Sequence, residues 1–250
     1  MTRVLTDPQP AISDRLRSRL EARLADRGLD LNRPLPDTPE PLPALEAAQR
    51  RIPYNYREAV VGHQDVAAWV RTIADAAVAP NSGDLNPQFG ATGRRRIAHG
   101  PSLLLWGPTG TGKTHEAFGA IRALTAAGCG VNWHATTAAD LFAEMRQRGG
   151  VDPEHLLRRI VRIPLLLLDD LGAAKGSEWT EELTFRLVNW RAENSMPTIF
   201  TSNLPPIRED WMPAHLPVLR DKVGDRVLSR LSGMCTAVEF TGPDRRFARR

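Results

Sequence analysis

The segment GPTGTGKT, residues 107–114, constrains the fold of this chain more than any other. It fits the pattern G-x-x-x-x-G-K-[ST], in which glycines let successive backbone N–H groups point inward at phosphate oxygens. The apolar segment SLLLW (102–106) precedes it, and a helix is predicted over 113–128, so the loop joins a buried strand to a helix N-terminus. The pattern predicts a nucleotide-binding P-loop, and a glycine-rich turn that matches by chance is the alternative.

Each part of this loop has an expected role. Gly107 and Gly112 allow the backbone to turn tightly around the phosphates. Lys113 supplies a positive charge for the β- and γ-phosphates, and the Thr114 hydroxyl is expected to bind Mg²⁺. The predicted nucleotide-binding residues are Gly107, Pro108, Thr109, Gly110, Thr111, Gly112, Lys113 and Thr114.

Two adjacent carboxylates end the apolar segment PLLLLDDLG, residues 164–172. Burying either charge without a partner would cost several kcal/mol, so an apolar strand that ends in both requires an explanation. In a P-loop fold this strand ends beside the phosphate loop and faces Mg²⁺. We expect Asp169 to hold the cation, directly or through water, and Asp170 to orient and deprotonate the attacking water. The alternative is that one of the two merely caps the following turn.

Asn203 follows another apolar segment, TIFTS (198–202). In a P-loop ATPase its amide is expected to contact the γ-phosphate or the attacking water. The alternative is that Asn203 simply opens the loop NLPP, since asparagine favours turns.

Apolar strands alternate with helices along the rest of the chain, which predicts an α/β fold with a parallel sheet covered on both faces. The expected strands are 102–106, 131–135, 165–169, 198–202 and 236–240. The expected helices are 113–128, 138–148, 153–161, 178–194 and a short one at 225–232. Segments 81–101 and 203–223 are rich in Pro, Gly and Asn and are predicted to be long loops.

Residues 1–50 are predicted to form an appendage to a main domain that spans 51–250. A short helix is expected over 11–28, with leucines and arginines each recurring every four residues. Five prolines follow within 34–43, and such a segment is stiff and extended. The appendage helix either packs on the main domain or offers its leucine stripe to a partner.

Composition excludes several classes of protein. No apolar run is long enough to span a bilayer, and the first residues, MTRVLTDPQP, lack the apolar stretch of a signal peptide, so neither a signal peptide nor a membrane partner is expected. Cys129 and Cys235 lie far apart, which favours a reduced, cytoplasmic protein without a disulfide framework, and the histidines show no metal-ligand spacing. The net charge of +4 is compatible with a nucleic-acid partner but does not demonstrate one.

With these motifs in order, the chain resembles an AAA+ ATPase, and more narrowly the DnaC/IstB-like group of helicase loaders and transposition helpers. The resemblance rests on LLLWGPTGTGKTHEA, on the segment from LLLLDDLG to TIFTSNLPP, and on RVLSRLSGMCTAVEFTGPDRR. It covers roughly residues 51–246. The chain stops about ten residues after the last expected strand, so the helical lid of many AAA+ proteins is not expected.

The resemblance implies Mg²⁺-dependent ATP hydrolysis and assigns further roles. Asn203 is the implied sensor that couples the γ-phosphate to conformation. The segment DRVLSRL is similar to the one that carries the arginine finger, with Arg230 as the expected finger and Arg226 as its neighbour or alternate. Such a finger would complete the site of a neighbouring subunit, so hydrolysis would require an ATP-bound homo-oligomer. The alternative is two solvated arginines on an exposed face.

The resemblance also implies a single-stranded DNA partner and a protein partner, either a replicative helicase or a transposase. The helical region 138–162 offers arginines that are expected to follow phosphates, namely Arg146, Arg148, Arg158, Arg159 and Arg162. A solvated basic helix face is the alternative, and GRRR (93–96) is a second, weaker candidate. No role is assigned to the terminal arginines Arg245, Arg246, Arg249 and Arg250.

Four functions fit the P-loop. The first is an ATP-dependent helicase loader, and the second, with the same motifs, is a transposition helper that delivers a transposase to target DNA. The third is a small-molecule kinase, against which the Asp-Asp pair and Asn203 indicate water activation. The fourth is an adaptor that binds ATP without hydrolysing it, and Asp170 argues against that function.

Overall fold

The computed structural model describes residues 50–78, 95–130, 132–146, 152–173, 176–210 and 212–247. The chain divides into two units, Met1–Pro39 and Glu40–Arg250, and every described residue belongs to the second. The expected helix at 11–28 and the proline-rich segment therefore lie outside the described residues, and the predicted appendage remains a prediction. Within the described ranges, every helix is too short or too polar to cross a membrane.

A sheet of five parallel strands forms the centre of the described unit, as expected. Its order is β4-β5-β6-β2-β7. The strands are β2 (Ser102–Trp106), β4 (Trp133–Thr137), β5 (Leu165–Asp169), β6 (Thr198–Ser202) and β7 (Cys235–Glu239). Because all neighbours are parallel, the loops that follow the strands gather at one edge of the sheet. A second sheet pairs the short strands β1 (Arg95–Arg96) and β3 (Cys129–Gly130).

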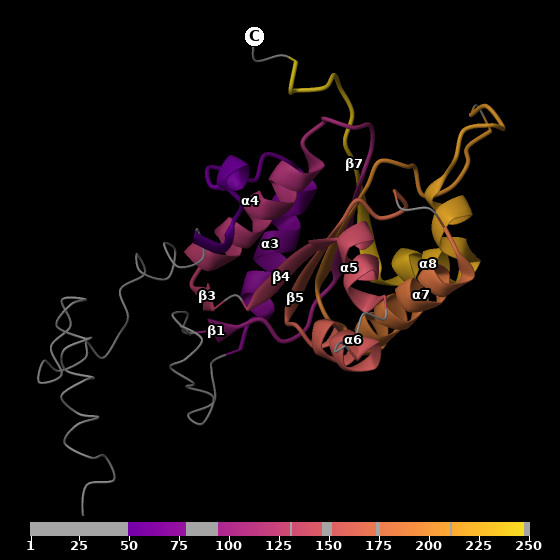
Figure 1. Ribbon diagram of the computed structural model, residues 1–250. Helices are drawn as coiled ribbons and strands as arrows, with labels where there is room; N and C mark the ends of the chain where they lie inside the picture. Colours follow the sequence, from indigo (N-terminus) through magenta and orange to yellow (C-terminus); the bar gives the residue numbers. More distant parts are fainter. Residues whose placement is uncertain are drawn as a thin grey trace, which may run out of the picture. The chain divides into compact units, whose positions relative to one another are not determined.

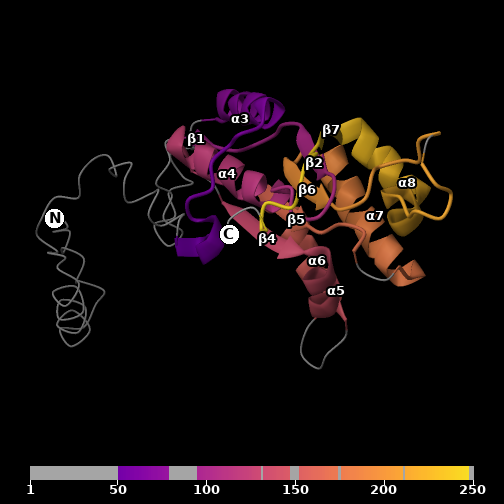
Figure 2. The ribbon, with the colours of Figure 1, turned by 90° about the horizontal axis from the view of Figure 1, so that it is seen from above.

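Helices cover both faces of the central sheet (Figures 1 and 2). Helices α3 (Gln64–Ala76) and α4 (Lys113–Ala126) lie on one face, and a short 3-10 helix, η1 (Tyr54–Tyr56), lies near α4. The other face carries α5 (Ala138–Met145), α6 (Pro153–Val161), α7 (Glu178–Glu193) and α8 (Leu219–Met234).

The four consecutive leucines of β5 are explained by this layering. Leu165 and Leu167 belong to the core beneath α3 and α4, whereas Leu166 and Leu168 belong to the core beneath α5 to α8. All four are at most 2% exposed. A strand with helices on both faces buries successive side chains on opposite sides, so it needs a continuous apolar run rather than an alternating one.

A buried arginine fixes the opposite ends of the strands that carry the site. Arg191 on α7 is fully buried, and its guanidinium donates hydrogen bonds to four oxygens, Val161 O, Ile163 O, Pro197 O and Thr198 Oγ1, at 2.6–2.8 Å. Val161 is the last residue of α6 and Ile163 precedes β5. Pro197 precedes β6, and Thr198 is its first residue. Burial lowers the pKa of Arg191 to about 9. The hydrogen bonds favour its charged form and set how β5 and β6 lie against α7.

Several boundaries differ from the sequence-based predictions. The expected loop at 203–223 ends earlier, because α8 begins at Leu219 and continues to Met234 across a break at Gly224. Gly224 has φ +81° and ψ 162°, a backbone conformation that essentially only glycine adopts. The expected strand at 131–135 is instead Trp133–Thr137, and the last strand begins at Cys235.

Four elements were not predicted, namely η1, α3, β1 and β3. Helix α3 has no counterpart among the expected helices, although its buried residues Val66, Trp69, Val70 and Ile73 follow helical spacing. Within the segment expected to be a loop at 81–101, Arg95 and Arg96 form β1, and residues 79–94 lie outside the described residues.

Candidate nucleotide-binding site

The phosphate loop connects β2 to α4, as the sequence predicts. Its three glycines, Gly107, Gly110 and Gly112, all have positive φ, at +141°, +82° and +104°. At Gly107 the loop lies so close to the end of β7 that a Cβ would be 2.0 Å from Phe240 O. Side chains at these positions would be strained or would clash, so the glycines are required by the conformation of the loop.

Lys113 is the first residue of α4 and is only 5% exposed. Its Nζ donates hydrogen bonds to Gly107 O at 2.8 Å and Pro108 O at 2.7 Å. An ammonium has three N–H donors, so one remains for a phosphate oxygen. Burial lowers the pKa of Lys113, and the nearby charges of Asp170 and Asp169 oppose that shift.

Thr114 and Asp169 meet at the first turn of α4. The Thr114 hydroxyl donates to Asp169 Oδ1 at 3.0 Å, and the Thr201 hydroxyl donates to the same oxygen at 2.5 Å. Burial raises the pKa of Asp169, and the charge of Asp170 raises it further, whereas the hydrogen bonds from Thr201 and Thr114 lower it.

The hydroxyl of Thr114 and the carboxylate of Asp169 are the hard oxygen donors that suit Mg²⁺. Two protein ligands are too few for a cage, but Mg²⁺ commonly binds through one or two protein oxygens together with substrate phosphates. Across the described ranges, no group of three or more His, Cys, Asp and Glu could hold a metal ion. The donor set therefore fits a cation that arrives with a nucleotide.

Asp170 and Asn203 are also brought together. Asn203 Nδ2 donates a hydrogen bond to Asp170 Oδ1 at 2.9 Å, and Asp170 N donates to the Thr201 hydroxyl at 3.0 Å. Asp170 has φ +55°, a left-handed conformation that is uncommon for a residue other than glycine. Such backbone conformations occur preferentially at functional sites, where the surroundings enforce them.

A cavity of about 560 Å³ contains these groups. Of the predicted residues, its lining includes Thr109, Gly110, Gly112, Lys113, Thr114, Asp169, Asp170 and Asn203. Four residues without a predicted role complete it, namely Tyr56, His115, Arg245 and Arg246. Thr111 is fully buried beneath the loop, and its hydroxyl donates to Pro108 O at 2.9 Å, so both residues shape the loop.

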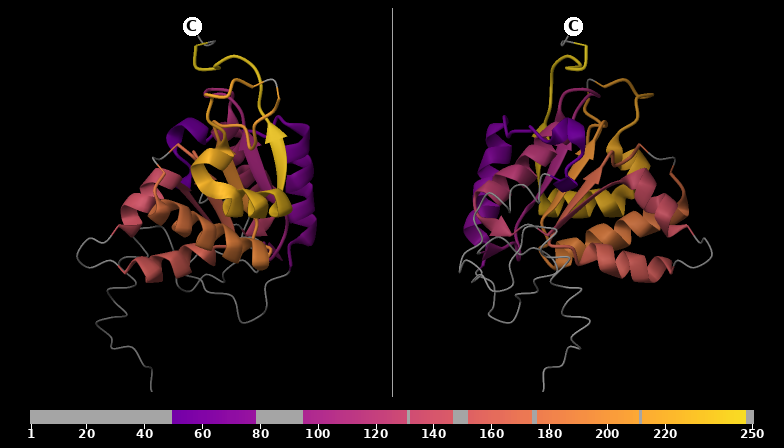
Figure 3. Two further views of the ribbon diagram at one scale, coloured as in Figure 1. Left: turned by 90° about the vertical axis from the view of Figure 1, so that its right-hand side faces the viewer. Right: turned by 60° about the vertical axis from the view of Figure 1, so that its left-hand side comes forward.

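The segment after β7 brings two arginines to this cavity. It leaves the sheet at the edge where the phosphate loop lies (Figure 3). Arg245 N donates to Gly110 O at 3.0 Å, and a Cβ on Gly110 would lie 2.0 Å from the carboxylate of Asp244. The sequence offered only a cluster of terminal arginines, without a signal that distinguished this pair. Arg249 and Arg250 lie outside the described residues.

The two candidate finger residues, Arg226 and Arg230, lie on α8, and neither is among the residues that line the cavity. The Arg226 guanidinium lies 3.7 Å from the ring centroid of Phe185 and 3.7 Å from the Glu182 carboxylate. Arg230 is exposed and has no polar partner among the described residues. Val227 and Leu228 of the same helix are buried, so they lie on a different face from the two arginines.

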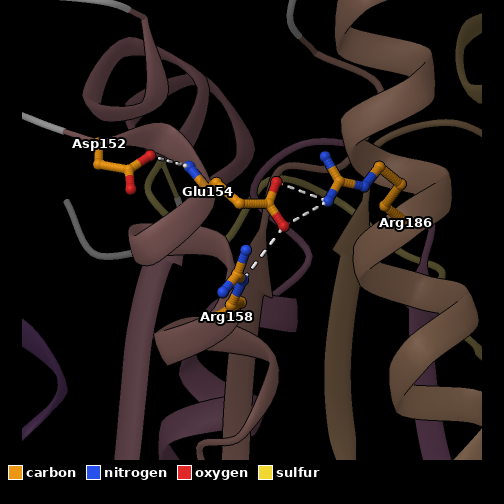
Figure 4. A network of polar contacts seen from close by, with 4 residues as sticks. All are labelled: Asp152, Glu154, Arg158 and Arg186. Atoms are coloured by element: carbon orange, nitrogen blue, oxygen red, sulfur yellow. Dashed lines mark hydrogen bonds and ion pairs between the residues drawn. The ribbon is translucent and has the colours of Figure 1, made fainter.

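The arginines expected to follow DNA are not equivalent. Arg158 and Arg186 both contact the carboxylate of Glu154, at 3.3 and 2.7 Å, and Asp152 accepts a hydrogen bond from Glu154 N (Figure 4). Arg159 and Arg162 on and after α6 are exposed, as is Arg146. Arg148 lies outside the described residues.

The second DNA candidate, GRRR at 93–96, has a structural arginine within it. Arg95 donates hydrogen bonds to Ala74 O at 2.9 Å and Ala127 O at 3.1 Å, so it joins α3 to the end of α4. Gly93 and Arg94 lie outside the described residues.

Comparison with known proteins identifies the family. Residues 96–250 match the family model described as IstB-like ATP binding protein. The chain belongs to this family of ATP-binding proteins. It is 30% identical over 161 residues to an insertion-sequence ATP-binding protein of Sinorhizobium fredii, covering 64% of the chain and 52% of that relative. It is 28% identical over 138 residues to an ATP-binding protein in an insertion sequence of Mycobacterium tuberculosis, covering 54% of the chain and 53% of that relative.

Solved structures agree with this fold assignment. The DnaC helicase loader superimposes with a TM-score of 0.54 at 22% identity, covering 76% of this chain and all of that one. A replication initiator DnaA bound to AMPPCP and single-stranded DNA superimposes with a TM-score of 0.53 at 20% identity, covering 77% of this chain and 52% of that one. The predicted resemblance to the DnaC/IstB-like AAA+ ATPases is confirmed, and the chain spans about half the length of the two sequence relatives of the family.

Replacing Arg246 or Arg245 by alanine should weaken ATP binding by about tenfold or more, because a hydrogen bond to a charged phosphate is worth about 1.5–3 kcal/mol. Titration of a fluorescent ATP analogue at fixed ionic strength measures the change. Arg220→Ala is the matched control, since Arg220 is an exposed arginine of α8 that pairs with Asp225. Unchanged affinity in both variants would mean that these guanidinium groups line the cavity without contacting nucleotide.

Proposed function

We propose that this chain hydrolyses ATP to ADP and phosphate in a Mg²⁺-dependent reaction that two neighbouring subunits complete together. The observation that carries the proposal is the convergence of Asp169, Asp170 and Asn203 with the phosphate loop on one cavity. A site that only bound phosphate would not need two carboxylates and a carboxamide there.

The phosphate loop binds the substrate. Its backbone N–H groups and the N-terminus of α4 contact the phosphates, and Lys113 adds a positive charge. Thr114 and Asp169 would hold Mg²⁺, which supplies neutralisation of the phosphate charge when bound. The partly desolvated Lys113 carries its charge at a site with few competing water molecules, which strengthens its attraction to phosphate.

Asp170 is the general base of the proposed reaction. A water oxygen bonds to the γ-phosphorus, the bond from that phosphorus to the bridging oxygen of ADP breaks, and the water proton passes to the Asp170 carboxylate. The Asn203 amide lies 2.9 Å from the Asp170 carboxylate and lines the same cavity, so it would contact the same water or the γ-phosphate. Asn203 therefore acts as the sensor that orients the nucleophile.

Arg230 is the proposed finger, and it acts in the site of a neighbouring subunit. Its exposure and the lack of a polar partner among the described residues leave it available for that contact. Arg226 is held against Phe185 and Glu182 of its own α7, which favours a role in orienting α8 rather than in the reaction. An arginine finger typically accelerates phosphoryl transfer by about 10³- to 10⁵-fold. The ATP-bound form is therefore expected to be a homo-oligomer.

Mixing two inactive variants tests both assignments at once. Asp170→Asn and Arg230→Ala should each lower ATP turnover by at least about 100-fold while leaving ATP affinity roughly intact. In a mixture, interfaces form between an intact Asp170 and an intact Arg230, so turnover should recover to about a quarter of the unmodified rate if subunits exchange freely and each interface acts alone. Arg220→Ala mixed with Asp170→Asn provides the control for simple addition of activities. Mixtures that stay inactive would contradict completion in trans.

Two kinds of partner are candidates for this ATPase. The helicase loader is the first candidate, in which residues 1–50 bind a replicative helicase and the ATPase acts on single-stranded DNA. The fold shared with a helicase loader is compatible with it. The second candidate is delivery of a transposase to target DNA. It is favoured by the family match and by relatives named for insertion sequences. In both, exposed Arg146, Arg159 and Arg162 are candidates to follow DNA phosphates.

Capture with both baits distinguishes the two candidates. Full-length protein and a chain lacking residues 1–50 are incubated with ATP and either the host's replicative helicase or the transposase of the same genetic element. Helicase capture that is lost on truncation would establish the loader. Transposase capture without helicase capture would establish the transposition helper, and it is the result that the sequence relatives favour.

A cytoplasmic location follows from either function, and both cysteines of the chain are free thiols.

A further inference from the structure

We infer that Thr201 is a positioning residue that fixes both catalytic carboxylates through one hydroxyl group. This inference rests on the proposed ATP hydrolysis and assigns to that site a residue which neither the phosphate-loop nor the Asp-Asp pattern includes. Thr201 lies on β6, two residues before Asn203, and is fully buried.

The Thr201 hydroxyl makes two hydrogen bonds in opposite senses. It donates to Asp169 Oδ1 at 2.5 Å and accepts from Asp170 N at 3.0 Å. A hydroxyl is the smallest side-chain group that can both donate and accept. One buried atom therefore contacts the side chain of the cation ligand and the backbone of the general base.

The pairing of β5 with β6 brings Thr201 to this position. Leu168 pairs with Phe200, so the next residues along the two parallel strands, Asp169 and Thr201, lie beside each other. After Asp169 the chain leaves β5 in a tight turn. In this turn Asp170 has φ +55°, and Leu171 N donates a hydrogen bond to Thr201 O at 2.8 Å. The side chain and the backbone of Thr201 thus hold successive residues of the same turn.

The left-handed backbone of Asp170 depends on these contacts. A non-glycine residue in this conformation costs of order 1 kcal/mol or more, and the partly buried N–H of Asp170 would lose its acceptor without the Thr201 hydroxyl. The turn directs the Asp170 carboxylate into the cavity, where Asn203 Nδ2 contacts it at 2.9 Å. Without the hydroxyl, both the Asp169 rotamer and the Asp170 backbone gain freedom.

The neighbouring residue Ser202 makes different contacts, so the role of Thr201 can be tested separately from the contacts that hold the phosphate loop. Ser202 Oγ donates to Leu171 O at 2.8 Å, and Ser202 O accepts from Gly107 N at 3.2 Å. These bonds join the turn to the phosphate loop and do not contact either carboxylate. A change at Thr201 should therefore affect the reaction more than the binding of ATP.

Thr201→Val and Thr201→Ser test the inference, because valine keeps the shape without the hydroxyl and serine keeps the hydroxyl. Groups that orient a metal ligand typically contribute about 10- to 100-fold to metal affinity or activity. We expect Thr201→Val to lower kcat by about 10- to 100-fold with KM for ATP changed by less than about threefold. It should also raise, by about tenfold or more, the Mg²⁺ concentration needed for half-maximal response of a fluorescent non-hydrolysable ATP analogue.

Thr201→Ser should stay within about threefold of the unmodified protein in both measurements, since the donor and acceptor remain. Thr184→Val is the matched control: Thr184 is a buried threonine of α7 whose hydroxyl donates to Thr180 O at 2.7 Å, away from the carboxylates. It should change neither kcat nor the Mg²⁺ dependence. If the valine variant does not fold, Thr201→Cys replaces it, because a thiol is a much weaker donor of similar size.

The two readouts separate this inference from the proposed function. If the unmodified chain turns over ATP and Thr201→Val retains full kcat and Mg²⁺ response, the inference is overturned while the ATPase assignment stands. If the unmodified chain does not hydrolyse ATP, the proposed function fails, and the Mg²⁺ response of the analogue still decides whether Thr201 positions Asp169. An equal loss in Thr184→Val or in Thr201→Ser would also overturn it, since general destabilisation would then account for the effect.

Discussion

Hydrogen bonds at the end of β6 hold the phosphate loop and the acidic turn in one site. Ser202 O accepts from Gly107 N at the start of the loop, and Thr201 O accepts from Leu171 N within the turn. Both contacts are possible because β6 lies between β2 and β5 in the sheet. The opposite end of β6 is held by the buried Arg191. A shift of this strand would therefore separate the phosphate loop from the acidic turn.

The site gathers charges that would not be stable together in an apolar core. Burial and the neighbouring Asp170 raise the pKa of Asp169, and burial lowers the pKa of Lys113, so each charged form is less favoured here than in water. The hydroxyls of Thr114 and Thr201 and the charge of Lys113 offset part of this cost at Asp169. A divalent cation and a polyphosphate would offset more, because each would meet preformed partners of opposite charge. The apolar strand with two terminal carboxylates is thus explained by what its end is built to bind.

Much of the fold and the centre of the site could be predicted from the sequence. The strands 102–106, 165–169 and 198–202 match β2, β5 and β6 residue for residue, because a buried parallel strand must be apolar throughout. Because the strands pair in parallel, the phosphate loop, the Asp-Asp pair and Asn203 meet at the same edge of the sheet. Helix α3 was not predicted, although Val66, Trp69, Val70 and Ile73 have the apolar spacing of an amphipathic helix.

Other parts could not be predicted, because they depend on contacts between distant segments. Arg245 and Arg246 reach the cavity only because the end of β7 packs on Gly107, and a tail of arginines gives no sign of such a contact. The break at Gly224 lies between two helical segments whose spacing gave no sign that they would join as α8. Tyr56 enters the lining through a short 3-10 helix that stacks its ring on Phe118, at 4.8 Å between centroids.

The proposed activity of this cavity is ATP hydrolysis rather than ATP binding alone. The most direct measurement is steady-state ATP turnover by the unmodified full-length chain, at several protein concentrations, with Mg²⁺ and with EDTA. We expect turnover that requires Mg²⁺ and whose rate per subunit rises with protein concentration, because a neighbouring subunit must complete the site. ATP binding without turnover at every concentration would contradict it, and the chain would then be an adaptor that uses ATP only to change conformation.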